Sequence, residues 1–185
     1  MPIPDYQSIM LPLLKHLGDG KVRSTQETLD VLAEKFDLSE EERKELLPSG
    51  QQPIFTNRVG WAKLYLRKAG LIEASERGQY KITYEGLNVL RQNPDRIDNR
   101  FLSKYPGFIE FTRGRKSEKS NQKKTETIEE EISNDKTPDE YLEYGYQKLR
   151  SDLANALIER IKDCPPAFFE KLVIELLLKM GYGGS

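Results

Sequence analysis

One long stretch without aromatic residues divides the chain into two parts that can fold. The segment RGRKSEKSNQKKTETIEEEISNDKT, residues 113–137, contains no aromatic residue and only two isoleucines. It cannot bury enough apolar surface to offset the conformational entropy that folding removes. Six basic residues from Arg113 to Lys124 come first, and four glutamates from Glu126 to Glu131 follow. We therefore expect a charged, disordered linker over residues 113–138, between an N-terminal domain of residues 1–112 and a C-terminal segment of residues 139–185.

The overall composition indicates a soluble protein without a membrane partner. The chain carries 29 basic and 30 acidic residues, so its net charge of −1 does not by itself indicate a nucleic-acid partner. The single cysteine, Cys164, cannot form an internal disulfide, which favours a reducing compartment. No stretch approaches the roughly 18 apolar residues of a membrane span, and the N-terminus lacks the pattern of a signal peptide. We expect a cytoplasmic protein.

The N-terminal part has the layout of helices followed by a hairpin. Apolar residues at helical spacing predict helices over 6–17, from 25 onward, over 40–47 with a capping box, and over 56–69. LIEA and YKIT are two strand candidates joined by the turn SERGQ, and Thr83 can cap a further helix. This order is typical of a winged helix-turn-helix, in which the third long helix enters the DNA major groove. The expected fold class is mainly α.

Positive charge is concentrated around the predicted helix 56–69. Residues 1–53 carry 6 basic and 10 acidic side chains, whereas residues 54–104 carry 10 basic and 5 acidic ones. The helix itself contains no acidic residue, and its bases lie outside its apolar stripe. Lysine and arginine neutralise phosphates, and arginine or asparagine can read base edges. The candidate DNA-binding residues are Asn57, Arg58, Trp61, Lys63, Arg67 and Lys68 on this helix, with Arg77 and Lys81 on the hairpin.

Two residues of this helix indicate that less of its surface is free to bind DNA. Trp61 is more readily explained by packing against the N-terminal helix or the hairpin than by stacking on a base. Leu64 lies nearly opposite the apolar stripe, which predicts that the helix is buried on two sides.

The C-terminal segment predicts two apolar helices and carries little chemistry. One stripe runs through Leu142, Tyr146, Leu149, Leu153, Leu157 and Ile161, and a second helix is expected over 166–180. Glu170 and Glu175 are five residues apart and therefore about 140° apart on a helix, so they cannot hold one metal ion together. His16, the only histidine, is expected in a core or capping role, and no phosphate-binding loop or zinc spacing occurs.

Three stretches of the chain resemble the Mrr family of type IV, methylated-DNA-directed restriction endonucleases. PDYQSIMLPLLKHLGDG and FTNRVGWAKLYLRKAGLIE with GQYKITYEGLNVL resemble the Mrr N-terminal domain. PPAFFEKLVIELLLKMGYGGS resembles the first helix of the Mrr catalytic domain, an α/β nuclease of the PD-(D/E)xK superfamily. The resemblance covers residues 3–112 and 141–185.

The resemblance implies a DNA-binding part of a restriction enzyme. Duplex DNA, methylated in the family, is the expected partner, and helices 139–163 and 166–180 can join copies of the chain. The family's metal-binding aspartate and Glu/Gln-x-Lys motif have no counterpart here, so Mg²⁺ is expected only with a complete catalytic domain. The chain alone is then expected to be inactive, with Glu170 in a supporting role.

Two other functional interpretations stay open at this point. The chain can be a standalone winged-helix regulator that dimerises through its C-terminal helices, or a winged-helix module that contacts only protein. Its preferred DNA site and its oligomeric state do not follow from the sequence.

Overall fold

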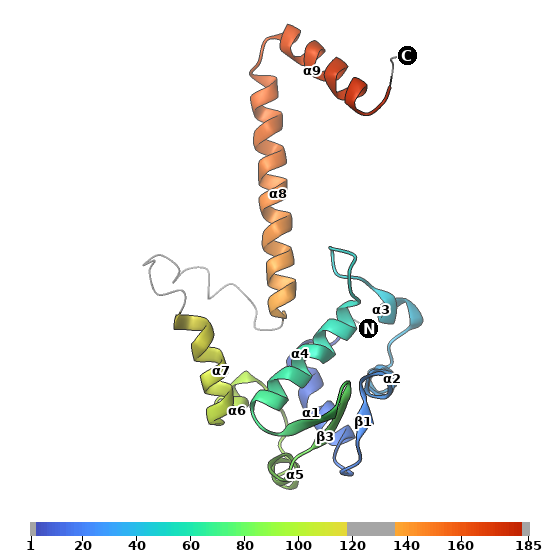
Figure 1. Ribbon diagram of the computed structural model, residues 1–185, viewed down its shortest axis with the longest axis vertical. Helices are drawn as coiled ribbons and strands as arrows, with labels where there is room; N and C mark the ends of the chain where they lie inside the picture. The colour runs from blue at the N-terminus through green and yellow to red at the C-terminus, as the bar shows by residue number, and fades with distance from the viewer. Residues whose placement is uncertain (1–2, 118–135, 183–185) are drawn as a thin grey trace. The chain divides into compact units, whose positions relative to one another are not determined.

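The computed structural model describes residues 3–117 and 136–182, and most of these residues are helical (Figure 1). The elements in chain order are α1 (Tyr6–His16), β1 (Arg23–Ser24), α2 (Thr25–Lys35), α3 (Glu40–Lys44), α4 (Ile54–Lys68), β2 (Ile72–Glu76), β3 (Gln79–Ile82), α5 (Tyr84–Arg91), α6 (Asn99–Leu102), α7 (Pro106–Ser117), α8 (Pro138–Lys162) and α9 (Pro166–Lys179).

The chain divides into two compact units. Unit 1 comprises residues 1–141 and unit 2 comprises residues 142–185. The division falls inside α8, so the first residues of that helix belong to unit 1. This boundary differs from the one expected at residue 139.

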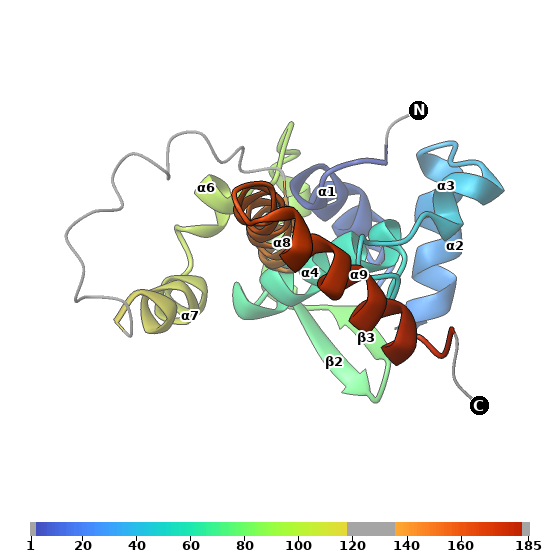
Figure 2. The same ribbon diagram turned by 90° about the horizontal axis from the view of Figure 1, so that it is seen from above.

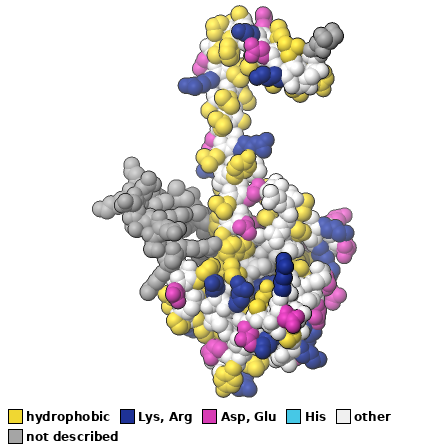
Figure 3. Space-filling model, viewed as in Figure 1, with side chains coloured by type: hydrophobic (Ala, Val, Ile, Leu, Met, Phe, Trp, Pro, Cys, Tyr) yellow, Lys and Arg dark blue, Asp and Glu magenta, His cyan; other side chains and the backbone are white. Residues whose placement is uncertain are grey.

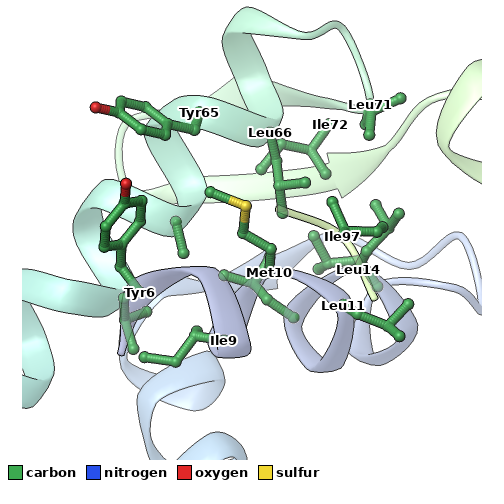
Figure 4. Packing of buried hydrophobic residues seen from close by; sticks show 14 of the residues in the cluster. Tyr6, Ile9, Met10, Leu11, Leu14, Tyr65, Leu66, Leu71, Ile72 and Ile97 are labelled. Carbon is green, nitrogen blue, oxygen red and sulfur yellow. The ribbon is translucent and has the colours of Figure 1, made fainter. Parts of the chain in front are cut away.

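The core of unit 1 lies between α1 and α4 (Figure 4). Asp5 caps α1 by accepting hydrogen bonds from the backbone N–H groups of Gln7 and Ser8. Both flanks of α1 are apolar, and Met10 and Leu14 are fully buried against Leu66 of α4 and its neighbours. Burying an aliphatic side chain of this size stabilises the fold by about 1.5–3 kcal/mol. The core stripe predicted for the third long helix is confirmed.

A small antiparallel sheet lies at the end of α4 (Figure 2). Its strand order is β1-β3-β2, with Ile72 opposite Ile82 in the hairpin. The backbone N–H of Thr25 donates to the carbonyl of Gly78 at 2.9 Å, which ties the start of α2 to the hairpin turn. Thr83 caps α5 through the N–H of Gly86, as predicted. The hairpin is therefore fixed at its turn by the start of α2, and at its end by the capped helix α5 that directly follows β3.

The structure extends the helical part of unit 1 further than the sequence predicted. Helices α6 and α7 were not expected, and α7 continues to Ser117, five residues into the segment assigned to the linker. The reason is an aromatic cluster, because the rings of Phe108 and Phe111 contact Tyr65 at centroid distances of 5.4 and 6.2 Å. The remainder of the predicted linker, residues 118–135, lies outside the described residues.

Unit 2 consists of the rest of α8 followed by α9, and its apolar side chains are exposed. No described residue from 142 to 182 is buried. Leu142 is 75% exposed, Leu149 71% and Phe169 52%. Figure 3 shows apolar side chains along the surface of both helices. The predicted stripe is thus present, but the two helices do not bury it against each other. Among the described residues no helix has an apolar run long enough to cross a membrane.

Candidate nucleic-acid interface

Helix α4 presents one side to the core and the opposite side to solvent. Val59, Ala62 and Leu66 of the inner side are at most 1% exposed. At about 100° per residue, Gly60, Leu64 and Arg67 lie on the other side, which we call the outward face. Arg67 is exposed and Leu64 is half-buried at the edge of the core. The expected burial on two sides is therefore only partial.

Lys63 joins α4 to the hairpin and to α2. Its ammonium donates a hydrogen bond to the hydroxyl of Thr25 at 2.9 Å and lies 4.1 Å from the ring centroid of Tyr80. Burial lowers the pKa of Lys63 from its ordinary value, and the positive charge of Arg67 lowers it further. Lys63 therefore places its charge at the junction of three elements instead of extending into solvent.

The other predicted cations differ in how strongly they are held. Lys68 lies over the ring of Phe111, with 4.9 Å between the ammonium and the ring centroid. Lys81 forms a half-exposed ion pair with Glu73 across the hairpin at 2.9 Å. Arg67 and the exposed Arg77 of the hairpin turn form no ion pair with another residue of 3–117 or 136–182. Arg67 on α4 and Arg77 on the hairpin therefore carry exposed charges that no ion pair among the described residues neutralises.

A shallow hollow lies between the outward face and the hairpin. Its volume is about 130 Å³, and it is lined by Gly60, Lys63, Leu64, Arg67 and Tyr80. Because Gly60 has no side chain, the surface beside Leu64 stays open, and a Cβ at residue 60 would meet nothing within 4 Å. The hollow therefore offers an apolar wall beside cationic groups.

The other flank of α4 binds the first residues of α8. Thr137 and Glu140 form a reciprocal capping box, in which each backbone N–H donates to the other residue's side chain at 2.8 and 3.2 Å. We call residues Thr137–Glu140 the acidic cap. All of them lie in unit 1.

The acidic cap forms hydrogen bonds with three of the predicted DNA-binding residues. The amide of Asn57 donates to Asp139 at 2.6 Å and accepts from the Thr137 hydroxyl at 2.7 Å, and Asn57 is only 3% exposed. The indole N–H of Trp61 donates to the same carboxylate oxygen of Asp139 at 3.0 Å. Each donor therefore has a partner within the chain.

Arg58 makes the most extensive contact with the acidic cap. Its guanidinium donates to the Glu140 carboxylate, with a shortest distance of 2.6 Å, and to the carbonyl of Ile3 at 2.7 Å. The two side chains are 16% and 10% exposed. Burial raises the pKa of Glu140, but hydrogen bonds from Arg58 and from the Thr137 N–H outweigh it, so that the net shift is downward. Glu140 is therefore held as a carboxylate.

The structure thus divides the predicted site residues into two groups. Lys63, Arg67, Lys68, Arg77 and Lys81 lie on the outward face, on its margin or on the hairpin, whereas Asn57, Arg58 and Trp61 contact the acidic cap. Tyr80 and the acidic cap were not predicted from the sequence. The motif TPDE at 137–140 signals a capped helix start with proline in its first turn, but not the surface on which that start packs.

The described residues do not form a metal centre. No three of their histidine, cysteine, aspartate or glutamate side chains are arranged to hold a metal ion. Glu170 is exposed on α9, and Glu175 of the same helix lies 3.9 Å from Lys171. The described residues therefore do not fit the Mg²⁺ ion of a nuclease, and no chemical step is assigned to them.

Comparison with known proteins shows what the chain is similar to. Residues 6–92 match the Mrr N-terminal domain family. The chain is 25% identical over 187 aligned residues to the "Type IV methyl-directed restriction enzyme EcoKMrr" of Escherichia coli (strain K12), an alignment that covers 100% of this chain and 61% of that protein. This chain therefore spans about three-fifths of the length of the relative. No solved structure matches it significantly. Residues 6–92 therefore resemble an Mrr N-terminal domain, and the chain as a whole is similar to a restriction enzyme of that name.

Proposed function

We propose that unit 1 is a winged helix-turn-helix domain that binds duplex DNA through the outward face of α4 and the β2–β3 hairpin. The observation that carries the proposal is the pairing of an acid-free helix with a fixed hairpin, with Arg67 and Arg77 exposed on them. In helix-turn-helix proteins the corresponding helix enters the major groove, and arginine contacts position the duplex by neutralising phosphates.

We further propose that the DNA is methylated and that this chain contributes recognition to a restriction activity. The support is the name of the relative, which describes a methyl-directed restriction enzyme. A methyl group in the major groove is read by apolar contact, as the methyl of thymine is. Leu64 supplies an apolar wall at the open hollow beside Gly60, with Arg67 next to it. In this arrangement Leu64 can contact the methyl group of a base, while Arg67 contacts a neighbouring phosphate or guanine.

Paired substitutions separate these two roles. In Arg67→Gln one phosphate contact is lost, so the slope of log affinity against log salt should fall by about 0.9 for every duplex. In Leu64→Ala the preference for a methylated over an unmethylated duplex should fall about fourfold, since one buried methyl group contributes about 0.8 kcal/mol. Fluorescence anisotropy of the full chain with duplexes carrying 5-methylcytosine, N6-methyladenine or no modification measures both effects.

Matched control substitutions remove a positive charge or an apolar side chain at other positions of unit 1. Lys35→Gln deletes one exposed positive charge of α2, and Val31→Ala truncates an apolar side chain that is 37% exposed. Neither should change affinity or preference. Absence of binding to every duplex at low salt would contradict DNA binding, and an unchanged methyl preference in Leu64→Ala would contradict the role of the hollow alone.

The exposed apolar residues of unit 2 favour self-association of the chain. Leu149 and Leu153 are 71% and 61% exposed on one stripe of α8. A second copy can cover this stripe in the manner of a coiled coil. Sedimentation velocity should show a dimer or larger species that shifts toward monomer in Leu149→Asn/Leu153→Asn, while the exposed-charge variant Arg150→Gln should leave it unchanged. A monomeric wild-type chain at every concentration would refute this proposal.

A further inference from the structure

The acidic cap occupies groups that a recognition helix offers to DNA. The Asn57 amide, the Trp61 indole N–H and the Arg58 guanidinium are all hydrogen-bond donors, and here they donate to carboxylate oxygens. Phosphate oxygens and the acceptor atoms of base edges are the corresponding partners in a protein–DNA interface. The two carboxylates of the acidic cap therefore satisfy the same donors that DNA would satisfy.

The position of these three donors along α4 is also where a DNA-binding helix would contact DNA. All three lie within the first eight of the fifteen residues of the helix Ile54–Lys68. In helix-turn-helix proteins the N-terminal residues of the recognition helix are the ones that contact base edges. Asp139 also lines a second hollow with Asn57, Gly60, Trp61 and Leu64, so its carboxylate borders the outward face. Its negative charge faces the region where we place the phosphates of a duplex.

We propose that the acidic cap is an autoinhibitory contact, which competes with duplex DNA for the N-terminal half of α4. The proposal rests on the proposed function of unit 1 in DNA binding. In the free chain the carboxylates of Asp139 and Glu140 hold Asn57, Arg58 and Trp61. A bound duplex displaces the cap, takes over these donors and leaves the acidic residues in solvent.

The contact is suited to exchange because it consists mainly of polar groups. Asp139 is exposed, and among the residues of the acidic cap only Thr137 is fully buried. A second anion can therefore reach the donors without breaking the α1–α4 core. Apparent DNA affinity is the intrinsic affinity multiplied by the fraction of molecules in which the acidic cap is open.

The central test opens the acidic cap in the full chain. Asp139→Asn/Glu140→Gln keeps the size of both side chains and removes their charges. We expect this variant to bind a fluorescein-labelled duplex about tenfold more tightly than the wild type at the same salt concentration. Glu40→Gln/Glu41→Gln removes two exposed negative charges from α3 in the same unit and should change affinity less than about twofold, because exposed charges are screened.

Trp61 gives a readout that does not depend on DNA. It is the only tryptophan of the chain, and its indole N–H contacts the acidic cap. The emission of the open variant should shift to longer wavelength as the indole gains solvent contact, and the α3 control should keep the wild-type spectrum. Identical spectra for the wild type and the open variant would show that the acidic cap is not docked in solution and would overturn the proposal.

The outcomes separate the two proposals. Equal or weaker DNA binding by a folded open variant, with wild-type binding intact, contradicts autoinhibition but leaves DNA binding in place. Failure of both chains to bind any duplex, although the Trp61 emission shifts, contradicts DNA binding by unit 1 and with it the competition.

Hydrogen exchange of the wild-type chain tests the same competition without any substitution. Addition of the duplex should slow amide exchange in α4 and accelerate it in residues 137–141, because these residues lose their partner. Unchanged protection of residues 137–141 in the complex would show that DNA and the acidic cap bind together, which contradicts the proposal even if the open variant fails to fold.

Discussion

Gly86→Ala is expected to destabilise unit 1 by at least about 3 kcal/mol and to lower its melting temperature by about 10 °C or more. A Cβ at this position would lie 2.2 Å from the carbonyl oxygen of Leu71 and 2.6 Å from Cγ1 of Ile82. The oxygen belongs to the backbone and already accepts a hydrogen bond from the N–H of Thr83 at 3.1 Å. Neither the first turn of α5 nor Leu71, which directly precedes β2, can move away without disturbing the hairpin between them.

Thermal unfolding followed by circular dichroism measures this effect, and Gly60→Ala supplies the matched control. A Cβ at residue 60 meets nothing within 4 Å. Alanine is also favoured over glycine inside a helix by about 0.5–1 kcal/mol. The control should therefore melt at or above the wild-type temperature, although its methyl group enters the hollow beside Leu64. Wild-type stability of Gly86→Ala would mean that α5 does not pack against Leu71 in this way.

Arg58→Ala is expected to destabilise the chain by about 2–3 kcal/mol, the second-largest effect. The guanidinium connects the Glu140 carboxylate with the carbonyls of Ile3 and Pro4, so its loss leaves three acceptors without their donor. Removing one partner of a largely buried ion pair is more harmful than replacing both by apolar groups. Arg58→Leu/Glu140→Leu should therefore lose less stability than the sum of its two single substitutions.

Denaturant unfolding of the four chains in this double-mutant cycle gives the coupling free energy between Arg58 and Glu140. A coupling near zero would mean that the ion pair does not form in solution. The same coupling bears on DNA binding, because contacts that stabilise the free chain must be broken before a duplex can use Arg58. Stability of unit 1 and DNA affinity should therefore change in opposite directions in acidic-cap variants.

Local sequence patterns predicted most of the elements of unit 1 because their determinants are neighbours in the chain. The capping box Ser39–Glu42, the Thr83 cap and the glycine turn of the hairpin each depend on residues within about one turn. Helix α3 ends at Lys44 instead of residue 47, because Leu46 pairs with Pro53 across the loop 47–52. Helices α6 and α7 were missed since they are stabilised by distant partners. The hydroxyl of Tyr6 accepts a hydrogen bond from the Asn99 amide of α6, and the ring of Tyr65 contacts Phe108 of α7.

The surroundings of the candidate site residues could be predicted only in part, for the same physical reason. A helical wheel correctly separates the core stripe of α4 from its bases, because that separation depends on spacing alone. It cannot show that Arg58 and Asn57 meet residues about 80 positions later in the chain. Bases outside the core stripe were therefore all assigned to DNA, whereas the structure gives one flank of α4 to the acidic cap.

Mapping amide chemical shifts of the labelled full chain during titration with a short duplex tests DNA binding by unit 1 most directly. We expect the largest changes on Gly60, Leu64 and Arg67 of the outward face and on Arg77 of the hairpin. A second set should fall on the acidic cap as it leaves α4. Changes confined to α8 and α9, or the absence of any change at low salt, would contradict a DNA interface on α4.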